Sequence, residues 1–321
     1  MKLQHIERKH MTNLVSDEWR LKIFFSVDLI GSTSYKAKKA ENGDDAEWCL
    51  FFAVFPLELT TSYQKQAILK HQKDSFEQVK IWKILGDEIL FYADLTNYQH
   101  IASHICAFKD SIQNYNLLLK GKKAPVPLCK GTVWTAGFPL SNIEIQINNT
   151  PDFIGSSIDA GFRLTKYSSS RKLCLSIEAL LMFCTTIIDE RIEKTEYPIR
   201  FEGKKELKGV LNNAPYPIFW LDIKKDDVVD KWLGKGENCE FNDIVKYCED
   251  FINDSEYLIQ PFIVGGMDKF NQIPDDIQNR KEKAVEARID PKQSIFADQE
   301  NDNENEKLID SIDIKIPYPK N

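Results

Sequence analysis

The chain has 321 residues, which leaves room for one domain of about 220 residues and a smaller one. Its net charge of −7 argues against a general nucleic-acid binder, because such proteins hold the phosphate backbone with clustered Lys and Arg. No segment reaches the roughly eighteen apolar residues that span a bilayer, and the seven cysteines lack zinc-site spacing, so we expect a cytoplasmic protein that does not contact a membrane.

The first elements alternate between strand and helix patterns. Residues 21–30 (LKIFFSVDLI) are apolar and rich in β-forming residues, which predicts a buried strand that ends in a loop at residues 31–33. Residues 44–70 have apolar side chains at helical spacing, and Pro56 predicts a kink or break. A hairpin is expected next, with strands at residues 76–85 and 88–93 joined by Gly-Asp.

The rest of the first domain continues this mixed pattern. An amphipathic helix is predicted at residues 101–119, then a strand at residues 128–137 and a loop leading into a helix at residues 152–167. Three further strands are predicted, at residues 172–176, 200–209 and 215–222. Strands and helices without a strict βα repeat indicate an α+β fold, a sheet with helices packed on one face.

The composition changes after residue 222. A charged stretch leads to a mainly helical block at residues 242–270, and the polar sequence beyond residue 274 predicts partial disorder. We therefore expect an N-terminal lead-in, a large α+β domain, a small helical domain and a polar C-terminal segment, at residues 1–20, 21–225, 226–275 and 276–321.

Two aspartates lie at predicted strand ends. Asp28 closes the first strand and Asp87 lies at the tip of the hairpin. Taken singly, Asp28 can cap the following turn, and Gly-Asp is a common turn dipeptide. Together they predict a divalent-cation site, because a shared cation relieves the repulsion of two neighbouring carboxylates. The backbone amides of the Gly31, Ser32 and Thr33 loop would then face phosphate oxygens.

Arg163 lies on a predicted helix four residues after Asp159. This spacing is typical of a surface ion pair worth a few tenths of a kcal/mol. Alternatively, the guanidinium of Arg163 stabilises negative charge that grows on a transferred phosphoryl group.

In this order the motifs resemble a known family. The succession FFSVDLIGST, KILGDEILF, KGTVWTAG, DFIGSSIDAGFRL and LCLS is similar to that of class III nucleotidyl cyclases, over residues 21–222. The resemblance implies a ferredoxin-like sheet. It makes Asp28 and Asp87 the ligands of two Mn²⁺ or Mg²⁺ ions, with the carbonyl of Leu29 as a third ligand, and Arg163 the arginine of the transition state.

The resemblance also assigns residues to the substrate. Lys83 and Asp152 match the pair that reads the base, and Lys208 matches a phosphate-binding lysine. One residue departs from the family, since Asp159 replaces the usual asparagine that orients the ribose. An aspartate accepts a hydrogen bond but cannot donate one, so either the geometry differs or the enzyme is slow.

The family forms its active site between two domains, so a chain with one such domain implies a head-to-tail homodimer. Asp28 and Asp87 of one subunit would face Lys83, Asp152 and Arg163 of the other. Asp152 would accept a hydrogen bond from the base and Lys83 would donate one. The Watson–Crick edges of adenine and cytosine match this pair, whereas those of uracil and guanine present the opposite polarity.

Further features resemble the pyrimidine cyclases of bacterial Pycsar anti-phage defence. These are the GDE turn, the segment FEGKKELKGVLNNAPYPIFWLDI and the trailing helical block. The Pycsar cyclases make cyclic CMP or cyclic UMP, which activates a separate effector protein. The alternatives are an adenylate cyclase and a degenerate module that binds nucleotide without turnover. A palm-type polymerase is disfavoured, because the chain is acidic and lacks a basic groove.

Overall fold

The computed structural model describes residues 18–70, 78–122, 125–147, 150–192, 197–223, 239–266, 269–274 and 277–279. Residues up to Ile273 belong to one compact unit and those from Pro274 to a second, of which only short pieces are described. The predicted lead-in, the charged stretch after residue 223 and the polar C-terminal segment therefore lie mostly outside the described residues. Within the described part, no helix combines the length and apolar character needed to cross a bilayer.

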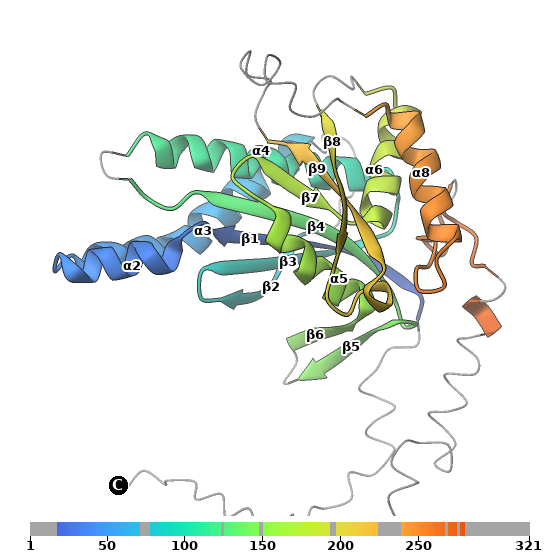
Figure 1. The fold of residues 1–321 in the computed structure, drawn as a ribbon, viewed down its shortest axis with the longest axis horizontal. Helices are drawn as coiled ribbons and strands as arrows, with labels where there is room; N and C mark the ends of the chain where they lie inside the picture. The colour runs from blue at the N-terminus through green and yellow to red at the C-terminus, as the bar shows by residue number, and fades with distance from the viewer. Residues whose placement is uncertain are drawn as a thin grey trace, which may run out of the picture. The chain divides into compact units, whose positions relative to one another are not determined.

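A seven-stranded sheet forms the centre of the first unit (Figure 1). Its strand order is β2-β3-β1-β4-β7-β9-β8, and only β4 and β7 run parallel. In that order the strands are β2 (Lys80–Leu85), β3 (Glu88–Leu95), β1 (Arg20–Leu29), β4 (Cys129–Phe138), β7 (Lys172–Leu175), β9 (Pro215–Asp222) and β8 (Ile199–Glu206). The predicted α+β sheet and its hairpin at Gly86-Asp87 are confirmed.

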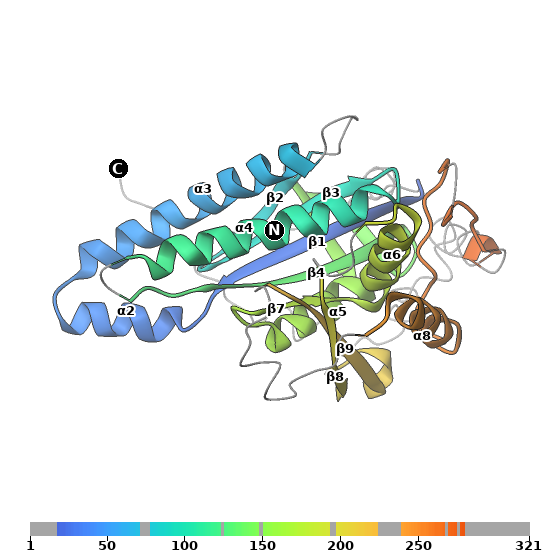
Figure 2. The same cartoon turned by 90° about the horizontal axis from the view of Figure 1, so that it is seen from above.

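Strand β1 has both faces buried, since alternate residues point to opposite sides of the sheet. Ile23, Phe25 and Val27 join a large apolar core on one face, which α3 (Asp45–Lys70), α4 (His100–Lys120) and α6 (Ile177–Asp189) cover (Figure 2). The buried side chains of α4 recur at helical spacing, which is why it packs flat on the sheet: Ile101, Ile105, Phe108, Ile112, Tyr115 and Leu119.

The second face of the sheet carries an aromatic cluster. Phe24, Trp82 and Trp134 belong to it, together with Phe153. It is covered by α5 (Ser156–Leu164) and by a separate two-stranded ribbon of β5 (Asn142–Ile147) and β6 (Thr150–Gly155). The predicted loop from residue 152 is therefore wrong, because a strand leads into α5. Only Phe153 of β6 is buried, so the strand carries almost no alternating pattern.

Two helices differ from the sequence expectation. Helix α3 continues through Pro56 for 26 residues, because Phe51, Phe55, Leu59 and Tyr63 form a buried stripe that packing holds in place. The predicted loop at residues 31–33 is instead the start of α2 (Ser32–Glu41), which follows Gly31 in the left-handed conformation (φ 72°).

Helix α8 (Phe241–Asn253) packs against α6 through the same core. Its buried residues Phe241, Ile244, Cys248 and Ile252 follow helical spacing. The rest of the predicted helical block, residues 254–266 and 269–270, is turns and extended chain, so that part of the expectation is wrong. The domain boundary at residue 225 falls outside the described residues and stays a prediction.

Gly161 sets how closely α5 approaches the sheet. A Cβ atom there would lie 2.2 Å from Cδ2 of Trp134. We predict that Gly161→Ala lowers the free energy of unfolding by about 1–3 kcal/mol through overpacking, although alanine favours an isolated helix by about 1 kcal/mol. Urea denaturation measures this change in the free energy of unfolding. Gly137→Ala, where a Cβ meets nothing within 4 Å, is the control. A more stable Gly161→Ala variant would show that α5 does not pack this tightly.

Candidate active site

Asp28 and Asp87 lie together at one end of β1. Asp28 is opposite Glu88 on β3 and Lys130 on β4, and Asp87 precedes β3 in a tight turn that Gly86 permits (φ 65°). Asp87 lies close enough to Asp28 for its charge to raise the pKa of Asp28, and Ser32 Oγ at the start of α2 donates to Asp87 Oδ2. The structure thus brings the two predicted metal ligands together beside a helix N-terminus.

The charge around this pair is unbalanced. Burial raises the pKa of Asp28, the hydrogen bond and charge of Lys130 lower it, and Asp87 raises it, with a net rise. Burial also raises the pKa of Glu88, whose Oε1 accepts a 2.6 Å hydrogen bond from Ser26 Oγ. When all three carboxyls are ionised, Lys130 leaves two negative charges uncompensated, which a divalent cation would neutralise.

The available ligand atoms fit a hard divalent cation such as Mg²⁺ or Mn²⁺, because all of them are oxygens. The described residues contain no group of three or more His, Cys, Asp or Glu side chains placed to hold a metal. The protein would therefore supply two carboxylates, and the backbone or the substrate would supply the rest. Leu29 can contribute only through its backbone carbonyl, since a leucine side chain has no atom that binds a metal.

Lys83 and Asp152 form the second cluster. Lys83 Nζ lies 2.6 Å from Asp152 Oδ1, which also accepts hydrogen bonds from Trp82 Nε1 (3.2 Å) and the Phe153 N–H (2.8 Å). Burial raises the pKa of Asp152, but these three donors outweigh it and hold the pKa below its usual value. With three donors on Oδ1 and none from the described residues on Oδ2, Oδ2 remains available to a ligand.

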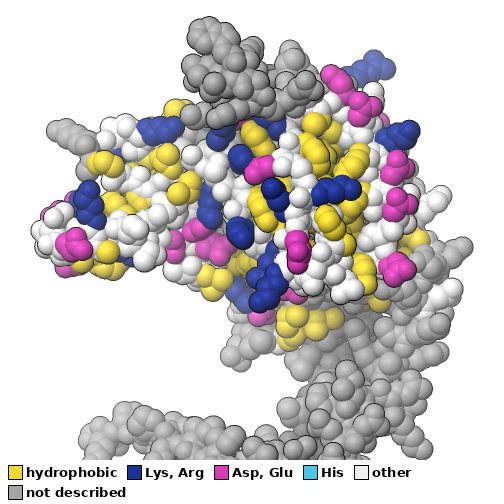
Figure 3. All heavy atoms as spheres, viewed as in Figure 1, with side chains coloured by type: hydrophobic (Ala, Val, Ile, Leu, Met, Phe, Trp, Pro, Cys, Tyr) yellow, Lys and Arg dark blue, Asp and Glu magenta, His cyan; other side chains and the backbone are white. Residues whose placement is uncertain are grey.

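Asp159 and Arg163 occupy the outer side of α5, and both side chains are exposed. The ion pair that their spacing allows does not form, and in the described part of the chain neither side chain makes any other ion pair or hydrogen bond. Lys and Arg side chains gather over the middle of the face on which α5 lies (Figure 3). Arg163 is thus held on a packed helix with its charge directed to solvent.

Thr33 and Lys208 complete the predicted site residues. Thr33 is exposed in the first turn of α2, next to the buried Ser32. Lys208 is exposed in the turn between β8 and β9, and no other described side chain pairs with it. Neither contacts the Asp28 and Asp87 pair.

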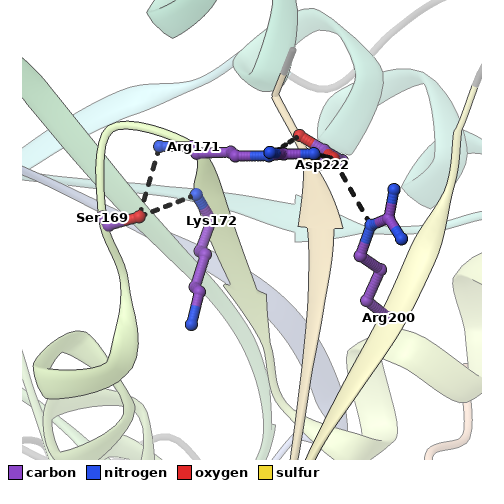
Figure 4. Close-up of polar contacts among 5 residues, drawn as sticks. All are labelled: Ser169, Arg171, Lys172, Arg200 and Asp222. Atoms are coloured by element: carbon purple, nitrogen blue, oxygen red, sulfur yellow. Dashed lines mark hydrogen bonds and ion pairs between the residues drawn. The ribbon is translucent and has the colours of Figure 1, made fainter. Parts of the chain in front are cut away.

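A buried ion cluster fixes the strands that carry the Lys208 turn (Figure 4). Asp222, at the end of β9, is fully buried and binds Arg171 Nη2 at 2.5 Å, while Arg200 Nε of β8 lies 3.4 Å from it. The Oγ of Ser169 accepts from the N–H groups of Arg171 and Lys172 at 3.3 and 3.2 Å. These contacts join the loop before β7 to both closing strands, so they have a structural role.

Within one chain, the predicted residues form two separate clusters. Among the described residues, no hydrogen bond or ion pair joins the aspartate pair to the Lys83 and Asp152 pair, or either of them to Arg163. The sequence reasoning missed Lys130, Glu88 and Trp82. A charged residue inside an apolar strand was a signal for Lys130, but its partner depends on the register between β1 and β4.

Comparison with known proteins gives structural matches alone. No family model and no curated protein matches the chain. Among solved structures, the chain is similar to the adenylyl cyclase CyaB from P. aeruginosa (14% identity, TM-score 0.43, covering 64% of this chain and 94% of that one). It is also similar to the guanylyl cyclase Cya2 (14%, TM-score 0.43, covering 66% and 95%) and to an adenylate/guanylate cyclase/hydrolase from Silicibacter pomeroyi (15%, TM-score 0.40, covering 64% and 97%). With TM-scores below 0.5, the function must be argued from the side chains.

The ion pair of Lys83 and Asp152 should make the stability of the fold depend on pH. The depressed pKa of Asp152 stabilises the fold above the pKa of about 4 of the unfolded chain, and that stability is lost as the pH falls through the lower folded-state pKa. We predict that Lys83→Met costs about 0.5 kcal/mol at pH 7, as expected for a partly exposed ion pair, and nothing near pH 2.

Urea denaturation between pH 2 and pH 7 measures this difference. Lys80→Met on the same strand is the control, because Lys80 lies over the ring of Tyr92 rather than beside a carboxylate. A cost that does not change with pH would mean that Lys83 does not hold the charge of Asp152.

Proposed function

We propose that the chain is a class III nucleotidyl cyclase that converts a nucleoside triphosphate into a 3′,5′-cyclic mononucleotide and pyrophosphate. The observation that carries this proposal is the placement of Asp28 and Asp87 on neighbouring strand ends, beside the N-terminus of α2. Two neighbouring carboxylates repel each other unless a cation joins them, and the adjacent amides suit a phosphate.

Each residue then has a chemical task. Asp28 and Asp87, with the Leu29 carbonyl, would hold two Mn²⁺ or Mg²⁺ ions, which supply charge neutralisation for the triphosphate and lower the basicity of the ribose 3′-hydroxyl. The backbone amides of Ser32 and Thr33, at the start of α2, would orient the phosphate oxygens. The 3′-oxygen attacks the α-phosphorus, and the bond between the α-phosphorus and pyrophosphate breaks. The proton of the 3′-hydroxyl passes to solvent.

The charge that develops on the α-phosphoryl group would be compensated by Arg163, which presents a fork of donors and has no partner in its own described chain. Asp159, one helical turn before it, would accept a hydrogen bond from the ribose. Lys208 would contact the outer phosphates.

The separation of the two clusters supports a head-to-tail homodimer. Arg163 is exposed on α5 and does not contact the aspartate pair of its own chain, so a second copy would complete the site. The edge strand β2 exposes apolar side chains that a second copy would cover: Ile81 (46% exposed), Ile84 (50%) and Leu85 (50%).

We propose that the base of the substrate is a pyrimidine, so that the product is cyclic CMP or cyclic UMP. This product would be a signal in anti-phage defence and would act on a separate effector in the cytoplasm. Asp152 Oδ2, which receives no hydrogen bond from the described residues, would accept from an exocyclic amino group, and Lys83 supplies a donor beside it. This polarity fits cytosine directly and adenine equally, so ATP is the competing substrate. The preference for a pyrimidine rests on the sequence resemblance.

Two observations support a second function. The described structure pairs Lys130 with Asp28 at 3.1 Å, and Asp159 replaces the usual asparagine, as would suit a module that binds nucleotide without turning it over. The presence of both aspartates and Arg163 favours the enzyme.

We predict that the purified protein forms one cyclic mononucleotide when it is incubated with Mn²⁺ and each ribonucleoside triphosphate in turn, with products identified by mass. Asp87→Ala should lower the rate by at least about a hundredfold without loss of folding, because cation binding is lost while carboxylate repulsion is relieved. Asp94→Asn is the matched control, since Asp94 pairs with Lys22 at the other end of β3. Near-wild-type activity in a folded Asp87→Ala variant would rule out this mechanism.

The proposed dimer predicts that two inactive variants restore activity when they are mixed. Asp28→Asn and Arg163→Ala should each be inactive alone. An equal mixture should recover about a quarter of the wild-type activity, because half of the dimers are mixed and each of those has one intact site. Recovery is measured by product formation after mixing and re-equilibration. No recovery, with mixed dimers confirmed by native mass spectrometry, would place Asp28 and Arg163 in the same subunit's site.

A further inference from the structure

Lys130 is an unusual lysine, because it lies on β4, a central strand of the sheet. Its Nζ is 3.1 Å from Asp28 Oδ2 and 3.4 Å from the carbonyl oxygen of Thr165, which follows α5. Its side chain is 22% exposed, and the register places it directly opposite Asp28. It therefore combines a fixed position with a charge directed at a proposed metal ligand.

Neighbouring charged groups leave Lys130 as the counterion of Asp28. Glu88, on the other side of Asp28, accepts its hydrogen bond from Ser26. Lys172 on β7, the strand next to β4, is paired with Glu202 at 2.5 Å. Among the described residues, Lys130 is thus the cation that offsets the aspartate pair.

The ligand atoms of the pair are already engaged. Asp28 Oδ2 accepts from Lys130, and Asp87 Oδ2 accepts from Ser32. A cation can bind both carboxylates only if some of these contacts are exchanged. An ammonium group 3.1 Å from one ligand also repels a divalent ion in the same place.

We propose that Lys130 is a built-in counterion that holds Asp28 until a divalent cation binds, and that it then turns to the triphosphate. This inference rests on the proposed function. The release has a chemical benefit, because a lysine freed from its carboxylate beside the metal carries its charge to the phosphates that arrive with the nucleotide. Lys130 is then both a competitor of the metal and a ligand of the substrate.

Two measurements distinguish this role from a purely structural one. Free Mn²⁺ is titrated by electron paramagnetic resonance without nucleotide, and the Michaelis constant is determined at saturating Mn²⁺. In Lys130→Met we expect Mn²⁺ to bind about three- to tenfold more tightly, because a competing charge is removed. The Michaelis constant for the triphosphate should rise at least about fivefold, because a phosphate ligand is lost.

Two variants serve as controls. Lys172→Met removes a lysine from the neighbouring strand and should leave Mn²⁺ affinity unchanged. Lys130→Arg keeps the charge and the fold, and should bind Mn²⁺ no more tightly than the wild type. Circular dichroism establishes that each variant is folded.

Equal or weaker Mn²⁺ binding in a folded Lys130→Met variant would overturn the competition, and so would tighter binding in Lys130→Arg. An unchanged Michaelis constant would overturn the contact with the triphosphate. Absence of Mn²⁺ binding in both the wild type and Lys130→Met would overturn the inference together with the metal site. Tighter binding in Lys130→Met without any cyclic product from the wild type would support the counterion and reject the cyclase.

Discussion

The placement of the Asp28 and Asp87 carboxyl groups on neighbouring strand ends is the constraint on which the proposed chemistry depends. It opposes folding, because two partly buried carboxylates repel each other and lose hydration. The sheet imposes it through the fixed register of β1 with β3 and β4, which the apolar residues of β1 anchor on both faces. Ser32 and Lys130 reduce its cost, and a divalent cation would remove more of it.

Local sequence signals were sufficient for the elements that position this pair. An apolar strand that ends in a polar turn located Asp28, and a Gly-Asp dipeptide between two strand patterns located Asp87. Lys83 and Asp152 were paired by family resemblance, since Lys83 lies on the edge strand β2 and Asp152 on the ribbon strand β6. Their 2.6 Å contact depends on how the ribbon packs over Trp82, which no local pattern contains.

The features missed by the sequence analysis have a common physical origin. The role of Lys130 depends on a cross-strand neighbour about a hundred residues away in the sequence. Strand β6 buries only one side chain. Neither feature therefore leaves a periodic pattern in the sequence. Pro56 was expected to kink or break α3. The helix is not broken, because packing against α4 and the sheet outweighs the cost of one lost backbone hydrogen bond. In each case tertiary contacts decided what local propensity could not.

Under the proposed head-to-tail dimer, the separation of the two clusters would make activity depend on the concentration of the chain itself. Gly161 lets α5 pack directly on Trp134, and Arg163 lies exposed on the outer side of that helix. In the proposed base-reading pair, three donors engage one carboxylate oxygen. If the site is completed by the proposed head-to-tail dimer, whatever favours dimerisation would control turnover without altering any residue that contacts the nucleotide.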